Sequence, residues 1–188
     1  MYYAPCMCQY SLQYQYPYYF NNPVYYSGGW SEGAISQDEL EHLNRMAFLQ
    51  SLNGKVKDHG PHPYVVNIND AAKENNTYRT AIWTGPHLQV TLMSIDVGGD
   101  IGLEVHPNND QFLRIEQGRG VVRMGNNKNN LTFEKQVRKD SAIMVPAGTW
   151  HNVINAGNVP LKLYSIYAPP HHPYGTIHRT KAEAIAEE

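Results

Sequence analysis

The sequence predicts an all-β fold, an antiparallel sandwich or barrel, on the strength of two observations. Short runs rich in β-branched, aromatic and other apolar residues recur about every ten residues from residue 64 onward. Gly, Pro, Asn or Asp bounds nearly every run, as the turns between antiparallel strands require. We therefore expect a single barrel over residues 64–170.

The expected strands follow one another with short breaks. They cover residues 64–68, 78–85, 87–97, 104–106, 111–117, 120–125, 131–137, 141–146, 151–155 and 161–167. DAAKEN, residues 70–75, predicts one or two turns of helix. The last segment, residues 171–188, predicts a loop followed by a short polar helix or a frayed end.

Two segments precede the barrel. Residues 1–30 hold most of the tyrosines, mixed with Pro, Gln, Asn and Gly, and lack any regular period. We expect them to form a disordered or loosely packed extension, whose rings lie on the barrel or a neighbouring subunit, or serve adhesion or crosslinking. In residues 31–63, a capping box at Ser36 and Glu39 and apolar residues at helical spacing up to Asn53 predict a helix and a linker.

Composition restricts the partners. The formal net charge is -2, so we expect no nucleic-acid partner, and no apolar run approaches the roughly 20 residues that cross a bilayer. The first residues lack the basic and apolar regions of a secretory signal, which favours the cytoplasm, with a spore coat as the alternative. Cys6 and Cys8 are the only cysteines, so the barrel has no disulfide framework.

One stretch, GLEVHPNNDQFLRIEQGRG, suggests a metal site. Glu104 and His106 are two residues apart and project from the same side of a strand, and Gln111 begins the returning strand. His151 follows a tight Pro-x-Gly turn in a second segment, SAIMVPAGTWHNVIN. Two imidazoles, a carboxylate and an amide oxygen suit a divalent transition metal, Zn, Mn, Fe or Ni, with positions left for water.

These two segments resemble the two motifs of the cupin superfamily. The first family motif runs Gly, five residues, His-x-His, three or four residues, Glu, six residues, Gly; this chain has Gly98, Glu104, His106, Gln111 and Gly118 at that spacing. The second motif runs Gly, five residues, Pro-x-Gly, two residues, His, three residues, Asn. Here Asp140 stands in the place of the first glycine, and the remaining positions are Pro146, Gly148, His151 and Asn155.

The resemblance implies a double-stranded β-helix, the cupin jelly-roll barrel, of the small phosphomannose-isomerase-like type. It also implies a metal at Glu104, His106, Gln111 and His151. Glutamate replaces the first histidine of the motif and glutamine replaces its glutamate, so the charge of the ligand set is kept. Type I phosphomannose isomerases hold zinc with two His, one Glu and one Gln. The alternative is a vestigial site whose polar residues only hydrogen-bond within the barrel mouth.

Three classes of function fit these expectations. The first is a metal-dependent enzyme on a small polar substrate, either a sugar or sugar-phosphate isomerase or an oxygen-dependent dioxygenase, with Glu104 and His151 in catalysis. A loop with His171, His172 and His178 could supply a base, although a surface or subunit contact is the favoured interpretation. The second class is a structural protein like those of bacterial spore coats, and the third a sugar sensor. We expect a homodimer.

Overall fold

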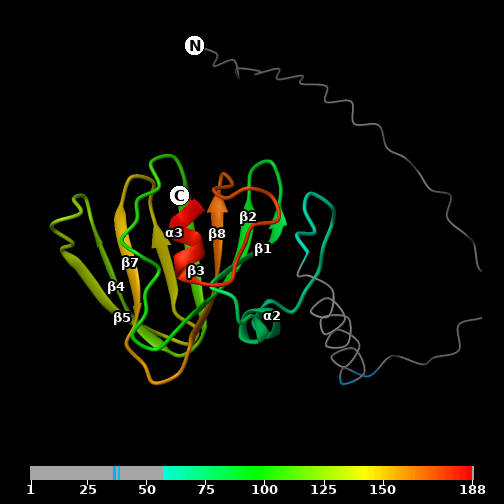
Figure 1. Cartoon of the computed structure of the whole chain (residues 1–188), viewed down its shortest axis with the longest axis horizontal. Coiled ribbons are helices and arrows are strands. Elements are labelled where there is room, and N and C mark those ends of the chain that lie inside the picture. Colours follow the sequence, from blue (N-terminus) through cyan, green and yellow to red (C-terminus); the bar gives the residue numbers. More distant parts are fainter. Residues whose placement is uncertain (1–35, 37, 39–56, 188) are drawn as a thin grey trace, which may run out of the picture. The chain divides into compact units, whose positions relative to one another are not determined.

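The computed structural model describes residues 36, 38 and 57–187. The tyrosine-rich extension lies outside this part of the chain, as does nearly all of the expected helix between Ser36 and Asn53. The described residues confirm the all-β jelly-roll fold, with strands in two antiparallel sheets and two short helices (Figure 1). No helix in the described part is long and apolar enough to span a membrane.

A six-stranded sheet, in the order β6-β3-β8-β2-β1-β9, faces a three-stranded sheet, in the order β5-β4-β7. Both are antiparallel throughout. The elements are α2 (Ile68–Glu74), β1 (Arg79–Thr84), β2 (Gln89–Ile95), β3 (Asp110–Gln117), β4 (Arg119–Gly125), β5 (Phe133–Arg138), β6 (Ala142–Val145), β7 (Trp150–Asn155), β8 (Leu161–Ala168), β9 (Ile177–His178) and α3 (Lys181–Glu187).

Helix α2 covers part of the outer face of the larger sheet. Ala71 and Ala72 pack against Ile82 and Leu92 of β1 and β2. The strand expected at residues 64–68 is wrong: residues 64–67 form no regular element and α2 begins at residue 68. The cause is local, because the Asn67 side chain accepts a hydrogen bond from the backbone of the first helical turn and so caps the helix.

The barrel interior is apolar at one end and polar at the other. Every second side chain of β2, β3 and β8 points into the apolar end, together with inward residues of the other strands. These core residues are Met93, Ile95, Leu113, Ile115, Val122, Val137, Val153, Leu161 and Leu163. Each such residue contributes about 1.5–3 kcal/mol through burial. Toward the other end the same strands present polar residues inward, namely Gln89, Thr91, Gln111, Ser165 and Tyr167, all buried. Buried polar groups require hydrogen-bond partners or a bound ligand. The polar end is therefore where a binding site can lie.

Two turns with left-handed residues shape the barrel, the Gly148 turn at the polar end and the Asp140 turn at the opposite end. Gly148, with a φ of 77°, lets the turn before β7 fold tightly, and its backbone N–H donates to the carbonyl oxygen of His106 at 2.9 Å. Asp140 has a φ of 69°, a left-handed conformation that Asp tolerates better than most residues. The exchange of Gly for Asp at this motif position is therefore compatible with the same turn.

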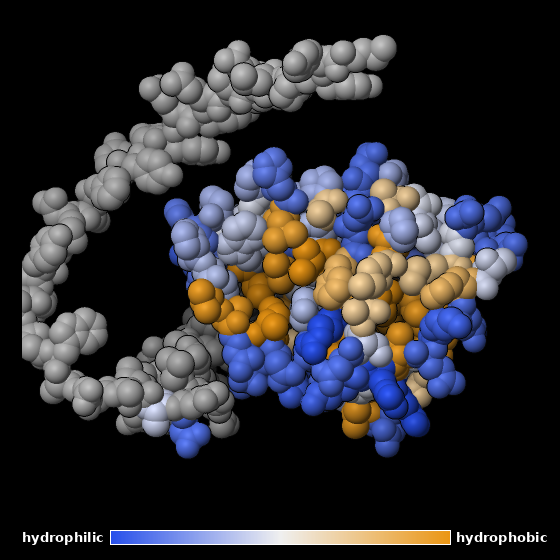
Figure 2. Space-filling model, turned by 180° about the vertical axis from the view of Figure 1, so that it is seen from behind, coloured by the Kyte–Doolittle hydropathy of each residue, from blue (hydrophilic) through white to orange (hydrophobic). Residues whose placement is uncertain are grey.

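Apolar side chains also gather on part of the surface. Figure 2 shows them across the middle of one face, ringed by hydrophilic residues. On the outer face of the larger sheet, Phe112, Met144 and Ile166 line a hollow of about 400 Å³. Met144, on the edge strand β6, is 65% exposed. This sheet face is therefore only partly covered by the described residues.

Candidate metal centre

Glu104 and His151 are brought together by the backbone. The N–H of Glu104 donates to the carbonyl of His151 at 3.0 Å, and the N–H of His151 donates to the carbonyl of Glu104 at 2.9 Å. The strand expected at residues 104–106 is reduced to this single bridge. Because the pair is antiparallel and directly opposed, the two side chains lie on the same face.

The side chains of Glu104, His106 and His151 converge. Glu104 Oε1 lies 3.3 Å from the Nε2 atom of His106 and 3.3 Å from the Nε2 atom of His151. One ligand atom from each residue lies within 4.8 Å of the other two, so the three form a candidate metal site. His106 and His151 are buried, and the Glu104 side chain is 14% exposed.

The backbone sets the orientation of the His151 ring. Its Nδ1 atom lies 2.9 Å from the carbonyl oxygen of Thr149, which can only accept a hydrogen bond. Nδ1 therefore carries the proton, and Nε2 presents its lone pair toward Glu104. Metal-binding histidines in general are oriented in this way by a carbonyl or carboxylate on the far nitrogen.

A hydrogen bond also orients the Gln111 amide for metal binding. Its Nε2 donates to the Ser165 hydroxyl at 3.0 Å, so the amide oxygen is the end left for another group. That oxygen, Oε1, is buried and has no hydrogen-bond partner in the described structure. Because buried acceptors rarely stay unsatisfied, this atom fits the fourth ligand position. Carboxylate, imidazole and amide oxygen donors together suit a divalent transition ion.

Electrostatics favours an ionised Glu104. Burial alone would raise the pKa of its carboxyl group, but the close approach of the His106 and His151 rings outweighs burial and holds that pKa well below its ordinary value. The buried guanidinium of Arg79 lies 4.0 Å from Glu104 Oε2. A carboxylate that stays charged at this position is a good metal ligand and a poor proton acceptor.

The loop after β8 folds against this centre and leaves His171 exposed at the surface. The His171 ring lies 4.1 Å from the His106 ring, between centroids, and 5.5 Å from that of Tyr167. Desolvation, followed by repulsion from His106, lowers the pKa of His171 to about 4. His171 is also exposed, so it stands at the mouth of the site as a neutral imidazole.

Buried Gln89 fixes this loop in place. Its Oε1 accepts from the backbone N–H groups of His171 and His172, at 3.3 and 2.9 Å, and its Nε2 donates to the His172 carbonyl at 2.9 Å. The loop is thus bonded to strand β2 at the level of the polar barrel end. The amide of Asn109 adds a bond to the carbonyl of Pro169 at 2.6 Å.

Sequence reasoning missed three residues of this environment: Arg79, Ser165 and Tyr167. Each is a polar residue at an inward position of an alternating strand. In LKLYSIY, for example, Leu161, Leu163, Ser165 and Tyr167 share the buried face. A polar residue on the apolar side of a strand was the signal that identifies them.

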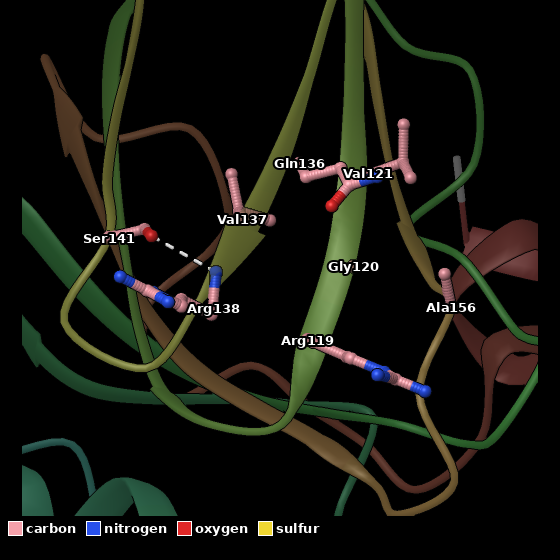
Figure 3. Close-up of a pocket in the computed structure, with 8 residues that line it drawn as sticks. All are labelled: Arg119, Gly120, Val121, Gln136, Val137, Arg138, Ser141 and Ala156. Atoms are coloured by element: carbon pink, nitrogen blue, oxygen red, sulfur yellow. Dashed lines mark hydrogen bonds between the residues drawn. The ribbon is translucent and has the colours of Figure 1, made fainter.

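A larger hollow of about 670 Å³ lies away from the centre, on the three-stranded sheet. Its lining includes Arg119 of β4 and Arg138 of β5, which are cross-strand partners. The polar residues Gln136 and Ser141 also line it. Figure 3 shows the two arginine side chains pointing apart, as two like charges should. This hollow has no carboxylate or imidazole in its lining and lacks the chemistry of the metal centre.

Comparison with known proteins agrees with the fold. A family model described as a cupin domain matches residues 91–167. The uncharacterized protein YrkC of Bacillus subtilis is 61% identical over 175 residues, which covers 91% of this chain and 94% of that protein. The uncharacterized protein L612 of Acanthamoeba polyphaga mimivirus is 44% identical over 115 residues, 61% of this chain and 70% of that protein.

A solved structure gives the same result. The crystal structure of BH2720 from Bacillus halodurans is 66% identical in sequence and superimposes with a TM-score of 0.69. The match covers 69% of this chain and 98% of that one. The barrel fold is therefore shared with this relative.

Proposed function

Because this chain belongs to the cupin family, we propose that it binds a divalent transition metal, Zn, Mn, Fe or Ni, and acts on a small polar substrate at the polar end of the barrel. Glu104, His106, Gln111 and His151 would hold the metal. The substrate class that we favour is a sugar or sugar phosphate, and the reaction an aldose–ketose isomerisation.

One observation carries the proposal: three ligand atoms converge within 4.8 Å around an ionised carboxylate, and the buried Gln111 Oε1 is left without a protein partner. A vestigial site would leave these groups to satisfy one another. Here the His151 Nε2 atom and Gln111 Oε1 are both buried and under-satisfied, although each residue's other end is hydrogen-bonded. A cation resolves both at once.

The division of roles follows from the charges. A bound divalent ion would supply Lewis-acid polarisation of a substrate carbonyl or hydroxyl. Glu104 and His151 contribute to catalysis as groups that set the charge and geometry of that ion. Proton transfer would fall to a group outside the ligand set, and His171 is exposed at the mouth with its ring centroid 4.1 Å from that of His106.

Hydrogen exchange in heavy water tests the reaction. Isomerisation through an enediol takes a proton from the carbon next to the carbonyl and returns one from solvent. We expect the zinc- or manganese-loaded chain to incorporate deuterium into at least one member of a panel of aldoses and aldose phosphates, followed by mass spectrometry. The Glu104→Ala variant is the control and should incorporate none; equal incorporation by both proteins, or by neither, contradicts the isomerase assignment.

A homodimer completes the proposal. Phe112, Met144 and Ile166 form an apolar hollow beside the free edge of β6, on a sheet face that the described residues cover only in part. Packing against a second copy would remove this apolar surface from water. The edge strand would be protected at the same time.

A further inference from the structure

His178 is a buried histidine that the metal centre does not use. It lies on β9, is 3% exposed, and is the cross-strand partner of Arg79 on β1. Directly opposed residues of an antiparallel pair project to the same face. Since the Arg79 guanidinium reaches to 4.0 Å from Glu104, the His178 side chain points into the same polar end of the barrel.

The carboxylate of Glu187, on α3, determines which nitrogen of His178 carries the proton. Glu187 Oε2 lies 2.8 Å from His178 Nε2, and a carboxylate only accepts hydrogen bonds. In the neutral ring Nε2 is therefore protonated and Nδ1 presents a lone pair. That Nδ1 atom is buried and has no hydrogen-bond partner among residues 57–187. An imidazole oriented by a carboxylate and left with a bare acceptor is the arrangement that accepts a proton or a hydrogen bond from a ligand.

A series of ring contacts connects His178 with the metal centre. The centroid distances are 4.1 Å from His106 to His171, 4.7 Å from His171 to His172, and 6.4 Å from His172 to His178. His172 Nε2 is, like His178 Nδ1, buried without a partner in the described structure. The polar end thus has unsatisfied groups at two places, around Glu104 and around His178, and a single metal ion satisfies only the first.

We propose that His178 Nδ1 accepts a hydrogen bond from a hydroxyl group of the substrate, with Glu187 as the residue that positions the ring. The ligand is a small hydroxylated molecule that spans from the metal centre to His178. A bare carboxylate or phosphate oxygen does not suit this atom, because two lone pairs would face each other. The inference rests on the proposed function in one respect, that the polar barrel end is the ligand site.

Nitrogen NMR of the histidine side chains tests the proposal on the full chain, labelled with ¹⁵N and loaded with zinc. The probes are D-mannose, D-fructose and D-glycerate, with acetate as a probe that has no hydroxyl. We expect His178 in the Nε2-protonated form, and an Nδ1 resonance that moves with at least one hydroxylated probe and stays in place with acetate. An Nδ1 resonance that moves with none of the three overturns the proposal.

Two substitutions on α3 distinguish a positioning role of Glu187 from a purely structural one. Glu187 is mostly exposed, so Glu187→Ala should keep the fold while the Nδ1 and Nε2 protonated forms of His178 become mixed and the responding probe binds about tenfold more weakly. Glu183→Gln, on the same helix, should change neither. Unchanged probe affinity and an unchanged protonated form in Glu187→Ala contradict the role given to Glu187.

Metal content, measured in the same samples, keeps this proposal distinct from the proposed function. A chain that takes up no zinc contradicts the metal centre. His178 still reports on hydroxylated probes in that chain, because its acceptor atom does not depend on the metal.

Discussion

The Nδ1 atom of His151 lies 2.9 Å from the carbonyl oxygen of Thr149, two residues before it in the chain. This contact selects the ring form in which Nε2 holds a lone pair, 3.3 Å from Glu104 Oε1. The backbone of the Pro-x-Gly turn thereby prepares the imidazole for a metal before any metal is present. Metal binding at this site depends on such preorganised side chains.

Gln111 should be a ligand through its oxygen. Replacing it with Leu removes the donor while keeping the volume similar, so zinc affinity should fall by about tenfold or more, measured by competition with a chromophoric chelator. Gln111→Glu keeps an oxygen donor and should bind at least as tightly as the wild type. Equal affinities in the Leu and Glu variants would show that Gln111 does not contact the metal.

Ser165 holds the Gln111 amide and should matter through it. In Ser165→Ala the amide loses its 3.0 Å hydrogen bond and its oxygen is no longer directed at the centre. We expect a weaker effect than that of Gln111→Leu, and no further loss when both changes are combined. Additive losses in the same competition assay would mean that the two residues act separately.

Gln89 should rigidify the loop that carries His171. Gln89→Leu leaves the backbone N–H groups of His171 and His172 without their acceptor, which should cost about 1–3 kcal/mol of unfolding free energy. Hydrogen exchange at these two amides should accelerate. Gln89→Glu keeps the acceptor for these two N–H groups but loses the donor to the His172 carbonyl. If both variants exchange at the wild-type rate, the loop is held by other contacts.

His172 should make the protein less stable in acid. Burial and the charge of Arg79 lower its pKa from 6.5 to about 2, so the folded ring stays neutral while the unfolded ring protonates below pH 6.5. The unfolded state then binds more protons, and stability that is full above pH 6.5 is lost as the pH falls. Between pH 7.5 and 5.0 this amounts to about 2 kcal/mol, at about 1.4 kcal/mol per unit.

Urea unfolding of metal-depleted protein at the two pH values measures this effect. His172→Gln should lose less stability than the wild type over the same interval, whereas His62→Gln, at an exposed position, should behave as the wild type does. The same pH dependence in all three proteins would contradict a neutral, partly buried His172.

The exposed sheet face should mediate self-association. Met144→Lys places a charge in the hollow formed with Phe112 and Ile166 and should convert the dimer to a monomer in light scattering. Val65→Lys, at a residue that is 96% exposed, should leave the dimer intact. A Met144→Lys protein with the wild-type mass would place the dimer contact elsewhere.

Spacing along the chain was sufficient to predict the fold and the convergence of three candidate ligands. Alternation and turn residues identified β1 to β8, and the motif distances brought Glu104, His106 and His151 together, as the structure confirms. One strand prediction failed because a local interaction competed with strand formation. Residues 64–67 have strand-like composition, but the capping side chain of Asn67 starts a helix instead.

The roles of the loop histidines could not be predicted, because they depend on contacts across the barrel. Nothing within APPHHPYG indicates that buried Gln89, 82 residues away, bonds the backbone at His171. The orientation of His178 likewise depends on Glu187, which reaches it only because α3 packs back against the barrel. Tertiary hydrogen bonds of this kind carry no local signal in a single sequence.

Metal analysis by mass spectrometry tests the central claim most directly. The protein is purified without an affinity tag beside a Glu104→Ala, His151→Ala double variant whose fold is checked by circular dichroism. We predict close to one Mn, Fe, Ni or Zn ion per wild-type chain and loss of that ion in the double variant. A wild-type chain without metal, or equal metal in both proteins, would contradict the account.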